Sequence, residues 1–287
     1  MRPFRLLLPD PAREIPLVLD SPHSGADFPD KFETLASAAE LRTAWDAHVD
    51  DLWTDAVTHG ASLLAADFPR TVIDANRAPD DIDPALLSDR WPATWGTLNP
   101  TRYSARGMGL VRRDILPGRP MYAAPLPPKQ VRDWLTKYHS RYHAALAERL
   151  EWLRGRFGQV WHIDCHSMKS RANAMNIDAG RKRGDIVIGD VDGSSTEPGF
   201  SDCLAAAFES AGYSVVINDP YSGGYIVQRY GQPDQGVHSV QIEINRALYL
   251  DENTTEKSTN YAALTADLSR IASVTADYVR SRLEVLA

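Results

Sequence analysis

Cysteine is scarce in this chain of 287 residues, which holds only Cys165 and Cys203. One lies in a predicted core strand and the other in a predicted helix, so they do not form the disulfide framework of a small secreted domain. No apolar run approaches the ~20 residues that a membrane span requires, and the run near the N-terminus is too short for a signal peptide. We therefore expect a soluble, cytoplasmic protein that does not bind membranes.

The chain also has no excess of basic over acidic residues. The formal net charge is −7 at pH 7, and a nucleic-acid partner would require a basic surface. The charge still allows a local group of arginines to bind a small anionic substrate. No internal repeat or linker is visible, so we expect one domain over residues 1–287. The sequence leaves open whether the chain forms a homo-oligomer.

What the sequence does contain is four apolar segments that each end in polar residues of catalytic type. The segments are residues 16–25, 71–77, 161–167 and 240–246. They carry His23, Asn76 with Arg77, His166 and Glu243. In open α/β sheets, ligands bind beyond the carboxyl ends of the parallel strands. The four segments therefore predict one site at that edge of the sheet.

The order of the predicted elements indicates the fold class. Strands are expected at residues 15–20, 61–66, 70–74, 161–167, 185–188, 213–218 and 237–244, and helices at residues 39–59, 130–156, 200–211 and 258–286. This alternation predicts an α/β fold with three layers, α/β/α, and a mixed, mostly parallel sheet. Residues 1–14 read as an irregular lead-in. Residues 78–127 lack a long periodic element, and we expect this insertion to roof the site.

His23 and His166 suggest a metal site. Histidine is the commonest zinc ligand, and a catalytic zinc has three protein ligands and one open position. Either histidine alone is better explained as a hydrogen-bonded structural residue. Two at strand ends, with carboxylates nearby, favour a metal.

Glu243 stands between Ile242 and Ile244 in a predicted core strand. Burying a carboxylate in such a strand costs free energy, so the residue is expected either to form an ion pair or to have a function. The functional interpretation is a general base that takes a proton from a metal-activated water and passes it to the leaving group. The alternative is a salt bridge to Arg77 or Arg246.

Arg77 follows Asn76 directly, and arginine binds carboxylates through two parallel hydrogen bonds. The competing interpretation pairs Arg77 with one of the aspartates in residues 80–89. Arg229 is a second candidate for binding an anion. A substrate with two carboxylates would need two such sites.

Two nucleophilic mechanisms are less favoured. Cys165 precedes His166, but neighbouring strand residues point to opposite faces, so this histidine cannot easily activate this thiol. Ser21 and Ser24 flank His23 without the G-x-S-x-G turn of many serine hydrolases.

The ordered set of motifs resembles the N-formylglutamate amidohydrolase (deformylase) family over most of the chain. The motifs are D-S-P-H-S-G at 20–25, D-x-N-R at 74–77, D-C-H-S at 164–167 and the segment 228–243. The resemblance implies hydrolysis of N-formyl-L-glutamate to formate and glutamate in histidine degradation. It also implies kinship with zinc carboxypeptidases and aspartoacylases, hence a phosphorylase/hydrolase-like fold and a zinc ion, or another divalent metal, as cofactor.

One departure concerns the third metal ligand. The carboxypeptidase pattern has a glutamate three residues after its first histidine, where this chain has Ala26. Asp46-Ala47-His48 is similar to an Asp-x-His pair of the deformylase family. The resemblance therefore implies Asp46 as the ligand, and His48 as a contact to the substrate or to the metal's surroundings. The alternatives to Asp46 are Asp27, Asp50 and Asp51.

Other functions stay open at this stage. The substrate could be another N-acyl or N-formyl amino acid or a peptide C-terminus. A non-catalytic protein that binds dicarboxylates on the same scaffold is the alternative from a different class. The combination of His23, His166 and Glu243 argues against it.

Overall fold

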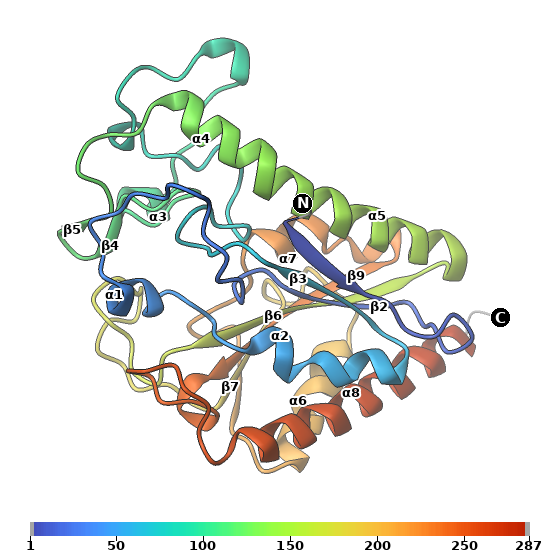
Figure 1. Cartoon of the computed structure of the whole chain (residues 1–287). Coiled ribbons are helices and arrows are strands. Elements are labelled where there is room, and N and C mark those ends of the chain that lie inside the picture. The colour runs from blue at the N-terminus through green and yellow to red at the C-terminus, as the bar shows by residue number, and fades with distance from the viewer. Residues whose placement is uncertain (1–2, 285–287) are drawn as a thin grey trace.

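The computed structural model describes residues 3–284 and has one central sheet of seven strands (Figure 1). The strands are β1 (Phe4–Leu7), β2 (Leu17–Ser21), β3 (Ser62–Ala66), β6 (Val160–Met168), β7 (Ile186–Gly189), β8 (Val215–Ile217) and β9 (Val237–Asn245). Their order is β1-β3-β2-β6-β9-β7-β8. Strands β3, β2, β6 and β9 are parallel, whereas β1 and β7 run antiparallel to β3 and β9. The predicted mixed, mostly parallel sheet is confirmed.

Helices cover both faces of this sheet. One face is covered by α4 (Pro128–Trp134) and α5 (Ser140–Phe157), and the other by α2 (Val49–Leu52), α6 (Phe200–Ser210) and α8 (Tyr261–Glu284) (Figure 1). The alternate residues Trp161, Ile163 and Cys165 of β6 pack into the core beneath α6 and α8. This packing confirms the α/β/α layering and gives Cys165 a core role.

The remaining elements are short. They are α1 (Ala38–Arg42), α3 (Arg102–Ala105), α7 (Tyr225–Tyr230), the hairpin of β4 (Asp114–Leu116) and β5 (Arg119–Pro120), the 3₁₀ turns Thr54–His59, Pro84–Leu86, Ala93–Trp95, Pro233–Gln235 and Arg246–Leu248, and the π-turn Leu135–His139. Several of them lie in residues 78–127, which explains why that segment shows no long period. Within residues 3–284, none of the helices combines the length and apolar character that crossing a bilayer requires.

Strands β6 and β9 are neighbours in the middle of the sheet and determine the positions of two candidate site residues. They are parallel and in register over nine residue pairs, and one of these pairs is His166 with Glu243. Neighbouring strands lie about 4.8 Å apart. Because β2 pairs with β6 in the same direction, the loop after β2, with His23, leaves the sheet at the same edge.

The helix predicted over residues 39–59 is wrong as a continuous element. A capping box at Ser37 and Glu40 starts α1, which ends at Arg42, and α2 begins only at Val49. In the break, His48 has a φ of 65°, and the Asp46 amide donates to the carbonyl of His23 (3.2 Å). The apolar spacing of this stretch arose from separate turns that pack on the same core. The break turns Asp46 towards the loop that carries His23.

Other expectations also need correction. Residues 70–74 form a turn instead of a strand, with the Asp74 amide bound to the Leu110 carbonyl (2.8 Å). Strand β1 lies inside the predicted lead-in and pairs with β3, and α7 was not predicted. The final helix is described to Glu284, and its predicted extension to residue 286 lies outside the described residues.

Candidate metal centre and active site

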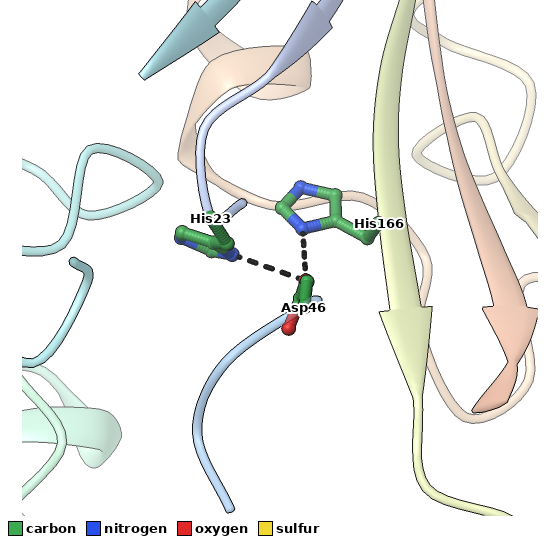
Figure 2. A group of neighbouring side chains, drawn as sticks. All are labelled: His23, Asp46 and His166. Atoms are coloured by element: carbon green, nitrogen blue, oxygen red, sulfur yellow. Dashed lines mark hydrogen bonds and ion pairs between the residues drawn. The ribbon is translucent and has the colours of Figure 1, made fainter. Parts of the chain in front are cut away.

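Three side chains converge at the carboxyl edge of the sheet (Figure 2). His23 follows β2, Asp46 lies in the break between α1 and α2, and His166 lies near the end of β6. Asp46 Oδ2 is 3.5 Å from His23 Nδ1 and 3.1 Å from His166 Nδ1. All three residues are buried, and one potential ligand atom from each lies within 4.8 Å of the others. No second cluster of this kind occurs among the described residues.

The other ring nitrogens face carboxylates. His23 Nε2 is 2.7 Å from Asp74 Oδ1, and His166 Nε2 is 2.8 Å from Asp164 Oδ1, although these two atoms are not aligned for a hydrogen bond. A carboxylate that holds the proton on Nε2 leaves the Nδ1 lone pair for a cation. His23 Nδ1 is buried without a hydrogen-bond partner. An unpaired buried nitrogen costs free energy unless a bound ion or molecule interacts with it. The donor set therefore fits a metal ion.

Asp46 is held in the ionised form that metal coordination requires. Its Oδ1 accepts a hydrogen bond from Arg246 Nη2 (2.7 Å), which leaves Oδ2 to face the two imidazoles. Burial alone would raise the pKa of Asp46, but His166, His23 and the charge of Arg246 outweigh burial and hold this pKa well below its ordinary value.

Glu243 faces the same cavity from β9, with 8% of its surface exposed. Gln241 Nε2 donates to its Oε1 (2.9 Å). The alternative salt bridge to Arg77 or Arg246 is not present, and no ion pair with Glu243 occurs within residues 3–284. Burial raises the pKa of Glu243 to about 7, a range in which a carboxyl group can both accept and return a proton at neutral pH.

The cavity beside these residues has a volume of about 370 Å³. Its wall is strongly cationic, with Arg70, Arg77, Arg102, Arg112, Lys169, Arg183 and Arg246. Among the described residues that line it, Glu243 is the one carboxylate. Such a wall attracts a small molecule with negative charge.

Asn76 ties several parts of the site together. Its Nδ2 donates to Asp164 Oδ2 (2.9 Å) and lies 2.9 Å from His166 Nε2, while its Oδ1 accepts from the Ile226 amide at the start of α7 (2.8 Å). A Cβ atom on Gly224 would lie 2.4 Å from Asn76 Nδ2. The amide of Asn76 thus links Asp164, which lies beside His166, to the start of α7.

Arg77 reaches the cavity without a carboxylate partner. Its guanidinium donates to the carbonyls of Asn76 (2.8 Å) and Met108 (3.2 Å) and lies 4.0 Å from the centre of the Tyr103 ring. The predicted alternative, a pair with an aspartate of residues 80–89, does not occur within the described residues.

Comparison with known proteins shows the family to which the chain is related. A family model described as N-formylglutamate amidohydrolase matches residues 15–250. The chain belongs to this family. It is 33% identical over 243 residues to an N-formylglutamate deformylase of Pseudomonas aeruginosa and 30% identical over 242 residues to one of Pseudomonas putida, with 83% of each chain covered in both cases.

A crystal structure of N-formylglutamate amidohydrolase from Ralstonia eutropha JMP134 is also similar. It is 40% identical to this chain, has a TM-score of 0.92, and the match covers 98% of this chain and 99% of that one. This family member is therefore an enzyme that hydrolyses a linear amide C–N bond.

Two histidines that sequence reasoning missed support the Asn76–Arg77 segment of the amidohydrolase. His143 Nε2 bonds the Ala75 carbonyl (2.8 Å) and His139 Nε2 the Arg77 carbonyl (2.9 Å). Burial lowers the pKa of His139 to about 3 and that of His143 to about 4, so both rings are neutral donors. Their spacing of four residues on a predicted helix was the available signal.

Two predicted substrate contacts of the amidohydrolase do not reach the cavity. Arg229 lies exposed on α7, with Nη1 3.1 Å from the Tyr225 hydroxyl, because that helix directs it to solvent. His48 Nε2 is 3.0 Å from the Thr255 carbonyl, because the left-handed turn at His48 directs its ring away from the metal cluster. The cavity lining includes neither residue.

The alternative third ligands do not belong to the cluster. Asp27 is exposed, Asp50 pairs with Arg5 (2.5 Å) and Asp51 pairs with Lys257 (2.6 Å). Of the four aspartates considered, the structure brings only Asp46 to the two histidines.

Proposed function

We propose that this enzyme hydrolyses N-formyl-L-glutamate to formate and L-glutamate with a bound zinc ion, as one step of histidine degradation. The observation that carries the proposal is the convergence of His23, Asp46 and His166 beside Glu243 in a cationic cavity. The printed names of the curated relatives support the substrate.

The proposed zinc ligands are Nδ1 of His23, Nδ1 of His166 and Oδ2 of Asp46. Two imidazoles and one carboxylate are a ligand set of catalytic zinc sites, which keep a further position open. When bound, the metal supplies Lewis acidity that polarises the formyl carbonyl and makes the attacking water a stronger acid. Asp74 bonds the outer nitrogen of His23, and the charge of Asp164 lies 2.8 Å from the outer nitrogen of His166, so both carboxylates favour these ring orientations.

Glu243 acts as the general base. It accepts a proton from the water as the water oxygen attacks the formyl carbon, and delivers it to the amide nitrogen as the C–N bond breaks. Formate and the free amine of glutamate result. The bond from Gln241 fixes one oxygen of Glu243 and leaves the other for the proton.

Arg77 binds the α-carboxylate of the substrate in this proposal. Asn76 supports it by accepting a bond from Arg77 on its carbonyl, and positions Asp164 beside His166. Fixing the amide against the base in this way lowers the barrier by removing orientational freedom before the reaction. We also propose that residues 78–127 roof the site, since Thr101, Tyr103 and Met108 line the cavity.

The proposal predicts that purified protein binds about one zinc per chain and that His166→Ala loses it. Removing one of three ligands leaves two protein side chains, which is fewer than a catalytic zinc site uses. Elemental analysis of both proteins, together with an assay for formate release from N-formyl-L-glutamate, measures the two effects. His59→Ala is the matched control, because His59 bonds Ser269 away from the site (3.2 Å) and should keep its metal.

Either of two outcomes would contradict this proposal. One is wild-type protein that takes up no metal after incubation with zinc. The other is folded His166→Ala that binds zinc as tightly as the wild type does.

A further inference from the structure

Arg112 is the most unusual charge in the cavity wall. Its side chain is buried, with 7% of the residue exposed, and its Nε has no hydrogen-bond partner. Within residues 3–284 it forms no ion pair with a carboxylate. Other deep cations of the wall are paired: Arg70 with Asp74, Arg183 with Asp178 and Arg246 with Asp46.

A buried charge without a partner is strongly unfavourable. Burial, together with the positive charges of Arg70 and Arg77, lowers the pKa of Arg112 to about 9, so the group is still cationic at neutral pH. The charges of Asp74 and Asp46 act on it from a distance, but among the described residues no carboxylate forms an ion pair with it. Because Arg112 lines the cavity, an anion bound there can supply the missing partner.

A second cation of the wall, Arg77, also lacks a carboxylate partner, although its guanidinium donates to two carbonyls. It lies next to Asn76, whose side chain contacts His166. The α-carboxylate is one carbon from the amide nitrogen and therefore suits Arg77. Lys169 lies on the wall near Arg112 and is likewise without an ion pair among the described residues.

We propose that Arg112 is the specificity residue that binds the side-chain carboxylate of an N-acyl dicarboxylic amino acid, while Arg77 binds its α-carboxylate. This inference rests on the proposed function and assigns a residue to the second negative charge of the substrate. A guanidinium can hold a carboxylate with two parallel hydrogen bonds, which an uncharged amide cannot match.

The test compares two substrates that differ in one charge, N-formyl-L-glutamate and N-formyl-L-glutamine. Arg112→Gln should lower kcat/KM for the glutamate substrate by about 10- to 150-fold, the effect of losing a hydrogen bond to a charged group. It should leave kcat/KM for the glutamine substrate nearly unchanged. Arg113→Gln is the matched control, because Arg113 pairs with Asp83 and Asp114 outside the cavity lining and should keep the wild-type preference.

An equal loss on both substrates would overturn the assignment, because Arg112 would then act on a part that the substrates share. If Arg112→Gln does not fold, as judged by circular dichroism, Arg112→Lys takes its place. That variant keeps the charge but loses the planar fork. A weaker preference for the glutamate substrate supports the proposal, and the full wild-type preference contradicts it.

A binding measurement separates this inference from the proposed reaction. Calorimetry with glutarate and with its monoamide, glutaramate, compares a dianion with a monoanion of similar shape. Wild type and Arg113→Gln should prefer glutarate, and Arg112→Gln should lose that preference. This result would support the role of Arg112 even if N-formylglutamate were not hydrolysed. Equal binding of both ligands to wild type would overturn it even if N-formylglutamate were hydrolysed.

Discussion

Replacing Glu243 with Gln is expected to lower kcat for N-formyl-L-glutamate by about 10²- to 10⁴-fold, the usual contribution of a general base. Glutamine has nearly the same shape but cannot accept the proton from water at neutral pH. Glu243 is not one of the proposed zinc ligands, so the metal content should stay at the wild-type level. Steady-state kinetics and elemental analysis of the same preparation measure both quantities.

Glu14→Gln is a suitable control for this change. Glu14 forms ion pairs with Arg149 and Arg156 and precedes β2, at the end of that strand away from His23. The Glu14→Gln substitution should change the stability of the fold and leave kcat near the wild-type value. If Glu243→Gln retained full turnover with its metal bound, the proton would have to pass through another group and the proposed mechanism would be wrong.

Gly224→Ala is expected to lower kcat by about 10²-fold, because a small displacement of a positioning residue can cost that much. The φ of Gly224 is −80°, which alanine adopts freely, so the effect is steric. The new methyl group would lie 2.4 Å from Asn76 Nδ2 and 2.5 Å from its Oδ1. Asn76 must then move away from Asp164. The Gly224 amide, which bonds Gln241 Oε1 (2.7 Å), would shift as well.

Stability should also fall in this variant, by about 1–3 kcal/mol, as in other overpacked sites. Gly155→Ala is the control, since Gly155 lies within α5 with no heavy atom near its added methyl group. That change should stabilise the fold by about 0.5–1 kcal/mol without altering kcat. Urea denaturation and kinetics on both variants separate the two effects. Unaltered turnover in Gly224→Ala would mean that the contacts of Asn76 are not needed for catalysis.

The residues at strand ends were predictable because strand geometry places them. The alternation in residues 161–167 separates His166 from Cys165, and the structure has this arrangement. The layering of the fold followed from the same regularity. What brings His23 to the same edge is the parallel direction of β2 and β6.

Residues in irregular segments were harder to predict. Only the family resemblance indicates Asp46 as a ligand. The spacing of its apolar neighbours predicts one continuous helix, whereas the chain has a break between α1 and α2 at this point. Arg112 lies in a segment without a period, and nothing in its neighbourhood marks it as buried. His139 and His143 look like ordinary helix residues, and only tertiary contacts show that they hold the backbone on both sides of Asn76.

The pairing of His166 with Glu243 across β6 and β9 has a consequence for how substrate preference can change in this enzyme. The separation of the two residues is set by the hydrogen-bonded ladder itself, so it does not depend on any loop. Arg112 and the rest of residues 78–127 belong to neither strand. In the proposed site, substitutions or insertions there can alter which acyl amino acid is accepted, while the distance between the proposed base and the proposed metal ligand stays constant. The scaffold thus permits new specificities to evolve without a new catalytic apparatus.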